Sequence, residues 1–381
     1  MARLNDSANV SRPSCAFQTR LSDFGINAES LWLPDLPKLL QPFRLVSELP
    51  IGFYENRCLK CGRQLVKYGN RETNYEIKKK LFCSDCESVT TLGFNRGAHV
   101  PVWVYDHVLF SMAKGHRNVD IQLEIERASK NQNLGPPSGI SVPTIYRVAW
   151  SSLNLMYKFE PLALRYLATK PISGPWCMDD RFHDLPFDQS LFPDKVLDPR
   201  KGNPHMYPTV VIHEKSKYAF SVCVSKNRDR FVAMRTLSFA LDRAGTQPEP
   251  LKIDSAKGLY AAARAFLPNE RILCVNKKDD YAFNNAVEMW WGHFGLRHNK
   301  HECQYRRPHT QECSLNIYRY YRDYVWPFKK TGKTPAETLG LVLPRNIGNR
   351  ISFIPLLEFA YRFTNFIESE LTRARSKRTL I

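Results

Sequence analysis

The sequence of 381 residues lacks two features that would place it in or across a membrane. No apolar run approaches the roughly 18 residues that a membrane-spanning helix needs. The first residues, MARLNDSANVSRPS, lack the basic-then-apolar pattern of a secretory signal peptide. We therefore expect a cytoplasmic protein without a membrane partner, in which the 10 cysteines stay reduced rather than form a disulfide framework.

Acidic residues are scarce relative to basic ones. The chain has 37 Asp and Glu against 55 Lys and Arg, which gives a formal net charge of +18 spread along its length. A field of this sign attracts polyanions, and binding to a phosphate backbone is its commonest use; general solubility is the alternative. With 43% hydrophobic and 12% aromatic residues, the chain has the composition of globular domains with at least one large core.

Four cysteines form two matched pairs within residues 51–95. CLKC contributes Cys58 and Cys61, and after 21 intervening residues CSDC contributes Cys83 and Cys86. Two such knuckles can complete a tetrahedral zinc site, and the short alternating segments between them suit a four-cysteine zinc ribbon. Four protein ligands leave no open position, so this Zn²⁺ would be structural. The alternatives are four unligated buried thiols or a redox pair.

Residues 100–157 have the pattern of three helices. A break at LGPPSG precedes the third, for which Ser141 is the expected N-cap and Pro143 lies in the first turn. This order resembles a helix-turn-helix, whose last helix would present Thr144 and Arg147 to DNA. A helical spacer without DNA contacts is the alternative.

From residue 171 the pattern changes to that of an α/β domain. Three strand candidates are followed by a helix with an apolar stripe at Phe231, Met234, Leu237 and Leu241, and then by alternating strands and helices. This is the element order of a ribonuclease H-like domain. Cutting phosphodiesters with two Mg²⁺ ions requires about three acids from different elements, and in this topology they belong on the first strand, after the fourth, and on the helix after the fifth. Asp179 or Asp180, Asp254 and Glu288 occupy those places. Taken singly, each is a common surface acid.

Four motifs in this order resemble the DDE transposases of bacterial and archaeal insertion sequences, which are relatives of retroviral integrases. They are WCMDD, KIDSAKG, NNAVE and the closing segment from Tyr320 to Leu341, which contains TPAE. The resemblance covers residues 175–343, within a catalytic domain expected over 171–343. It implies that Asp179, Asp254 and Glu288 are catalytic and hold two Mg²⁺ or Mn²⁺ ions. It also implies cleavage and strand transfer of double-stranded DNA on the nucleoid by a homodimer or larger assembly.

The same motifs also have structural interpretations. TPAE is a capping box that can simply begin a helix. Strand alternation sends Asp179 and Asp180 to opposite faces, and the resemblance selects Asp179 as the ligand. Two features depart from the family: Gly295 stands where many relatives have a basic residue, and the closing segment lacks a frequent histidine.

Two basic segments complete the chain's possible contacts with DNA. The first is RHNKHECQYRRPHTQEC, residues 297–313, in which we expect phosphate contacts from Arg297, Lys300, Arg306 and Arg307. The alternative for this segment is a second zinc site that would use His298, His301, Cys303, His309 and Cys313. Residues 350–381 are expected to be a C-terminal basic helix, either solvated or touching DNA. Residues 1–50 are expected to be an irregular arm.

Two other functions fit the same residues. One is a non-catalytic DNA-binding protein derived from a transposase, which would keep the ribbon and the basic surface. The other is a ribonuclease H-like nuclease without strand transfer. Joining of a pre-cut 3′ end to a second DNA separates both from a transposase.

Overall fold

The structure, a computed structural model, describes residues 58, 63–72, 77–91, 100–132, 140–181, 183–184, 205–226, 230–276, 278–298, 308–344, 347–348 and 350–378. Residues 1–45 and 46–381 form two compact units. The first unit, and with it the predicted N-terminal arm, lies outside the described residues. In the part of the chain that is described, no helix is both long and apolar enough to cross a bilayer.

The segment between the cysteine pairs forms a small antiparallel sheet in the order β1 (Val66–Glu72), β2 (Ile77–Cys83) and β3 (Ser88–Thr91). The two strands predicted between the cysteine pairs are therefore confirmed. Leu65 and Leu81 are buried beside Cys58 and Cys83, and they form the small core of this sheet.

Three helices follow, as predicted: α3 (Val102–Lys114), α4 (Asn118–Gln132) and α5 (Val142–Tyr166). Gly115 ends α3 in a left-handed conformation with φ of 86°, which glycine adopts without strain. Ser141 is the N-cap residue of α5, although its hydroxyl lies 3.1 Å from that of Thr144 rather than on a backbone N–H. The helix runs beyond the predicted residue 157, because Phe159 and later buried residues continue its apolar face.

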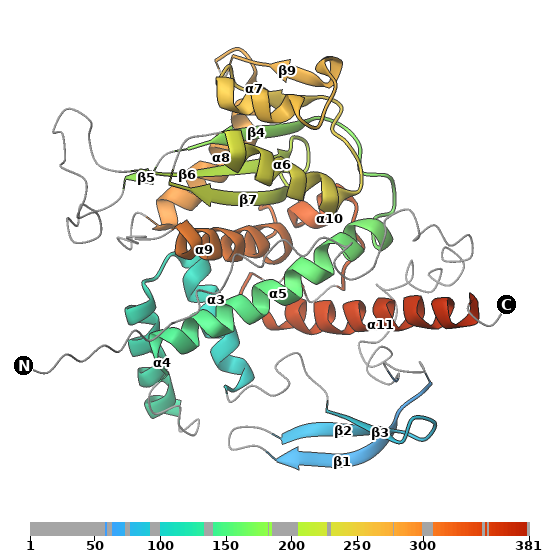
Figure 1. Cartoon of the computed structure of the whole chain (residues 1–381). Coiled ribbons are helices and arrows are strands. Elements are labelled where there is room, and N and C mark those ends of the chain that lie inside the picture. The colour runs from blue at the N-terminus through green and yellow to red at the C-terminus, as the bar shows by residue number, and fades with distance from the viewer. Residues whose placement is uncertain are drawn as a thin grey trace, which may run out of the picture. The chain divides into compact units, whose positions relative to one another are not determined.

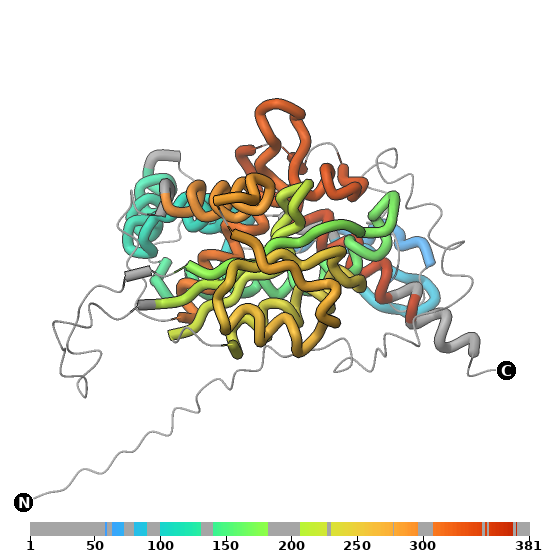
Figure 2. The backbone as a smooth tube through the Cα atoms, turned by 90° about the horizontal axis from the view of Figure 1, so that it is seen from above, coloured from blue at the N-terminus to red at the C-terminus, as the bar shows by residue number. Residues whose placement is uncertain are grey.

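A mixed sheet forms the centre of the α/β region (Figures 1 and 2). Its strands are β4 (Trp176–Asp180), β5 (His183–Asp184), β6 (His205–His213), β7 (Ala219–Ser225), β8 (Leu251–Ile253) and β9 (Ile272–Cys274). The pairing gives the order β7-β6-β4-β8-β9, with the short β5 alongside the start of β6. β6 is antiparallel to both of its neighbours β4 and β7, whereas β4, β8 and β9 are parallel to one another. This arrangement is compatible with a ribonuclease H-like fold.

Helices cover both faces of the sheet (Figure 1). On one face Cys177 and Val210 pack in a core cluster with residues of α8 (Tyr281–His298) and α9 (Pro308–Tyr320). The other face is covered by α6 (Arg230–Ala244) and α7 (Lys257–Arg264). There the Ser221 hydroxyl donates to the Thr236 carbonyl of α6 at 2.6 Å.

The prediction of which side of α6 is buried is wrong. Phe231 is 63% exposed, and Met234 and Leu241 are only half-buried. The side chains that α6 buries are instead Val232, Ala233, Thr236, Leu237 and Ala240. Apart from Leu237, this face carries small side chains, because the helix lies close to β6 and β7, which leaves little room for larger ones.

A fully buried cluster of charged groups attaches α5 to this region. Glu160 accepts hydrogen bonds from Arg319 Nη1 at 2.5 Å and Nη2 at 2.9 Å. It also accepts from the hydroxyls of Tyr218 at 2.5 Å and Tyr320 at 3.0 Å, and lies 3.3 Å from Arg243 Nε. Burial alone would raise the pKa of Glu160, but the two arginines outweigh it and the pKa is lowered. The carboxylate is therefore charged and satisfied in the core.

The closing segment contains a π-helix, Tyr321–Val325, and α10 (Pro335–Leu339), and α11 (Ile354–Arg378) follows it. The predicted capping box at α10 is confirmed: Thr334 Oγ1 accepts from Glu337 N at 3.3 Å, and Glu337 Oε2 accepts from Thr334 N at 2.7 Å. Asp106 of α3 accepts from Phe353 N at 2.6 Å, just before α11, which packs along α5. A C-terminal helix was predicted here, and α11 confirms it.

Candidate active site

Asp179 on β4 and Asp254 directly after β8 occupy equivalent positions along two neighbouring parallel strands. In the pairing of β4 with β8, Met178 is opposite Ile253, and each acid is the next residue along its strand. Adjacent strands lie about 4.8 Å apart, so the two Cα atoms are near neighbours at this edge of the sheet. Asp179 is 1% exposed, and Asp254 is half-buried.

The two acids also share a face of the sheet. Side chains alternate along a strand, so Asp179 lies on the face of Cys177, and Asp254 on that of Lys252. Cys177 packs in the core cluster beneath α8, and Lys252 Nζ is 2.8 Å from Asp280 Oδ2 immediately before α8. Both acids therefore belong to the face that α8 covers.

Asp180 lies on the opposite face, as predicted. Together with Thr209, its cross-strand partner, it lines a pocket of about 240 Å³ beneath α6 and α7. The remaining lining residues are Ala233, Ala256, Lys257, Gly258 and Leu259. The neighbouring acids in WCMDD thus have different surroundings, and only Asp179 shares a face with Asp254.

Glu288 lies in the middle of α8, on a side chain that is exposed to solvent. Its neighbours Val287, Trp290 and Trp291 are buried against the sheet, so Glu288 lies on the flank of the helix. Among the described residues, the carboxylates of Asp179, Asp254 and Glu288 are not gathered into a group within 4.8 Å. The structure thus brings two acids to adjacent positions and places the third on the covering helix.

Lys252 connects β8, which Asp254 directly follows, with the helix that carries Glu288. Its Nζ is 2.6 Å from Glu214 Oε1 and 2.8 Å from Asp280 Oδ2. Asp280 Oδ1 also accepts from Phe283 N at 2.8 Å in the first turn of α8. The hydrogen bond from Lys252 lowers the pKa of Asp280. Burial would lower the pKa of Lys252, but the hydrogen bonds with Asp280 and Glu214 outweigh it and raise that pKa.

Sequence reasoning missed these three residues. An Asp just before an apolar helical run is a readable N-cap signal, so Asp280 could have been identified. Nothing in the sequence pairs it with Lys252, which is 28 residues away.

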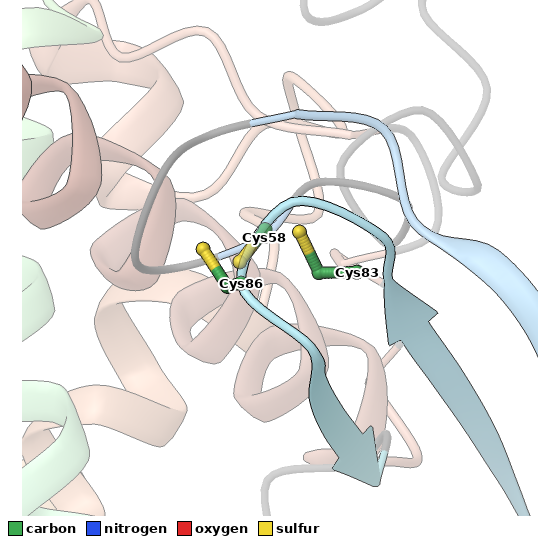
Figure 3. A group of neighbouring side chains, drawn as sticks. All are labelled: Cys58, Cys83 and Cys86. Carbon is green, nitrogen blue, oxygen red and sulfur yellow. The ribbon is translucent and has the colours of Figure 1, made fainter.

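Three of the four predicted zinc ligands converge (Figure 3). The sulfur atoms of Cys58, Cys83 and Cys86 all lie within 4.8 Å of one another. Cys58 and Cys83 are buried, and Cys86 is half-buried. Cys61 lies outside the described residues. An ion pair of 2.8 Å between Arg63 and Asp85 joins the two cysteine-bearing turns at the surface.

Two of the predicted DNA-contacting residues have described side chains. Thr144 is half-buried and Arg147 is exposed, both in the first two turns of α5. Arg297 belongs to α8, but its side chain lies outside the described part, as do the whole of Lys300, Arg306 and Arg307. Whether these residues bind DNA stays a prediction.

The predicted second zinc site has only two residues with described side chains. Both lie on α9, where His309 is exposed and Cys313 is buried. Burial raises the pKa of the Cys313 thiol, which keeps it protonated in the core. The side chain of His298, and the whole of His301 and Cys303, lie outside the described residues.

Comparisons with known proteins give little further information. No protein-family model matches the chain, and no curated protein matches it. Among solved structures, it is similar to a chain in the cryoEM structure of the simian T-cell lymphotropic virus intasome in complex with PP2A regulatory subunit B56 gamma. The TM-score is 0.30 and the identity 12%, over 58% of this chain and 75% of that chain. A similarity this weak supports no inference about function.

Proposed function

We propose that this protein is a DDE transposase that binds the ends of a transposon, cleaves DNA in a Mg²⁺-dependent reaction and joins the freed ends to target DNA. One observation carries the proposal. Asp179 near the end of β4 and Asp254 directly after β8 lie next to each other on the face that α8 covers, and α8 carries Glu288. This is the distribution of acids over strands and helix that the sequence resemblance implies.

The metal ligands in this proposal are Asp179, Asp254 and Glu288. Carboxylate oxygens are the hard ligands that Mg²⁺ and Mn²⁺ prefer. Two carboxylates one strand spacing apart repel each other, and a divalent cation between them would relieve that repulsion, so the donor set fits the ions. When bound, two ions would activate a water or a terminal 3′-hydroxyl and stabilise the leaving oxygen.

The reaction would proceed in two displacements without a covalent protein intermediate. Water attack on a phosphodiester releases a 3′-hydroxyl at the transposon end, and that hydroxyl then attacks a phosphodiester of the target DNA. Because two ends must be joined together, the active form would be a dimer or larger assembly on DNA. Its substrate would place it on the nucleoid of the cytoplasm.

The cysteine cluster would hold a structural Zn²⁺ through Cys58, Cys61, Cys83 and Cys86. With Zn–S distances of about 2.3 Å, the sulfurs of a tetrahedral site are roughly 3.8 Å apart. The described sulfurs, within 4.8 Å of one another, are close to that spacing. The ribbon and the helical region would then recognise the terminal repeats.

One observation favours a second candidate. Glu288 is exposed and is not gathered with the other two acids, which a non-catalytic DNA-binding descendant of a transposase would tolerate. Strand transfer of a pre-cut 3′ end separates these functions, and it also separates a transposase from a simple nuclease. Transfer that requires Mg²⁺ and is lost in Asp254→Asn, with DNA binding retained, supports the transposase.

A further inference from the structure

The exposed face of α5 forms a continuous polar stripe along the helix. At 100° per residue, Arg147, Lys158 and Arg165 lie within about 20° of one another around the axis. Ser151 and Asn154 lie between them on the same side, and all five are exposed. The opposite side is buried against other helices and includes Ile145, Met156 and Ala163. The stripe is therefore defined here as Arg147, Ser151, Asn154, Lys158 and Arg165.

This stripe contains no acid. The only acid in α5 is Glu160, which is 0% exposed and paired with Arg319. A solvated helix face ordinarily mixes both signs, and α4 does so with Asp120, Glu126, Arg127 and Lys130. The exposed charge of α5 is therefore purely positive, separated by small polar side chains that can donate hydrogen bonds to phosphate.

The spacing of the cations suits an extended polyanion. With a rise of 1.5 Å per residue, Arg147 lies about 16 Å from Lys158 and about 27 Å from Arg165 along the axis. All three separations exceed the size of a single small anion, and the steps between successive cations, about 16 Å and about 10 Å, are comparable to the roughly 12 Å width of a major groove. A duplex lying along the helix could contact all three.

The helix is also fixed to the catalytic region. Glu160 of α5 binds Arg319 of α9, and the chain enters β4 ten residues after the end of α5 at Tyr166. DNA held along the stripe would therefore be held relative to the strand that carries Asp179.

We propose that the stripe of α5 binds the phosphate backbone of duplex DNA without reading its sequence. This extends the predicted DNA contacts of Thr144 and Arg147 along the whole helix. The identity of the DNA as a transposon end rests on the proposed function, whereas binding to a duplex does not.

The test measures binding of the full chain, without metal, to a duplex from the gene's own flanking sequence and to a scrambled duplex. Affinity is followed by fluorescence anisotropy over roughly 50–200 mM salt. Lys158→Gln and Arg165→Gln should each reduce the slope of log affinity against log salt by about 0.9 and weaken binding roughly eight-fold at 0.1 M salt. Both duplexes should be affected equally. Arg165→Lys should keep the slope.

The matched control is Lys130→Gln on α4, an exposed cation on a helix that also carries the half-buried acids Asp120 and Glu126. It should leave the slope unchanged. An unchanged slope in Lys158→Gln and Arg165→Gln, or an equal loss in Lys130→Gln, would overturn the proposal. Strand transfer at saturating DNA is scored separately. If strand transfer is absent but Lys158→Gln and Arg165→Gln still reduce the salt slope, the transposase proposal is rejected and the stripe proposal is not. If strand transfer occurs but the salt slope is unchanged in these variants, only the stripe proposal is rejected.

Discussion

Lys252 on β8 forms an ion pair with Asp280, the residue before α8, with 2.8 Å between Nζ and Oδ2. The pair ties the strand that leads to Asp254 to the helix that carries Glu288. It is therefore a positioning contact for a site assembled from two separate elements. Groups that orient metal ligands in this way typically change metal affinity by about 10–100-fold when they are removed.

Lys252→Met should raise the Mg²⁺ concentration needed for half-maximal strand transfer by roughly ten-fold, because α8 loses its attachment beside β8. The measurement is a Mg²⁺ titration of strand transfer at saturating DNA. Lys215→Met removes an exposed lysine next to Glu214 and serves as the control. A Mg²⁺ dependence equal to that of the unmodified chain would reject the positioning role.

The same pair should make stability depend on pH. The pKa of Asp280 is lowered from 3.8, so its contribution is fully present above pH 3.8 and is lost as the pH falls through the folded value. The pKa of Lys252 is raised above 10.5, so its contribution is lost only as the pH rises through that higher value. The stability difference between the unmodified chain and Lys252→Met should be constant around neutral pH and shrink below 3.8, measured by denaturant unfolding. A constant difference down to strongly acidic pH would contradict this.

Glu160→Gln should destabilise the folded chain by about 3–5 kcal/mol, because it leaves the buried Arg319 without its carboxylate. Denaturant unfolding measures the change. Glu358→Gln is the control: it breaks an i,i+4 pair of 3.7 Å with Arg362 on α11, where Glu358 is 41% exposed, and should cost about 0.5 kcal/mol or less. Equal costs for the two variants would show that the buried cluster does not stabilise α5 in the fold.

The purified chain should contain one Zn²⁺, measurable by elemental analysis, and Cys83→Ser should lose it together with the preference for the transposon end over a scrambled duplex. The physical reason is that three thiolates hold Zn²⁺ far more weakly than four. Cys274→Ser changes an exposed cysteine outside the cluster and should keep the metal. A chain that carries no Zn²⁺ after expression with zinc would exclude the ribbon site.

Much of the α/β region could be predicted from sequence because its signals are local. The strand WCMDD, the capping box at Thr334 and the helix that carries Glu288 each depend on residues within a few positions. The order of strands and helices then indicated a ribonuclease H-like topology. The candidate acids were identified from their positions in that order of elements. The face of Asp179 could be assigned relative to Asp180 by alternation alone.

The features that were missed depend on contacts between distant segments. Glu160 and Arg319 are 159 residues apart, and no local pattern pairs them. The sequence predicted that α6 buries its large apolar residues. Close packing against β6 and β7 instead buries mainly small side chains of α6, and Phe231 is exposed. Local periodicity finds a helix, but its neighbours decide which side is buried.

The central claim is that Asp179, Asp254 and Glu288 form one metal-dependent site. The most direct measurement is Mg²⁺-dependent joining of a pre-cut 3′ end to a second DNA, comparing Asp179→Asn with Asp180→Asn. The two positions are adjacent in sequence and lie on opposite faces of β4. We expect Asp179→Asn to lower strand transfer by at least roughly 10³-fold with DNA binding retained, while Asp180→Asn stays active. Full transfer by Asp179→Asn, or an equal loss in both variants, would contradict it.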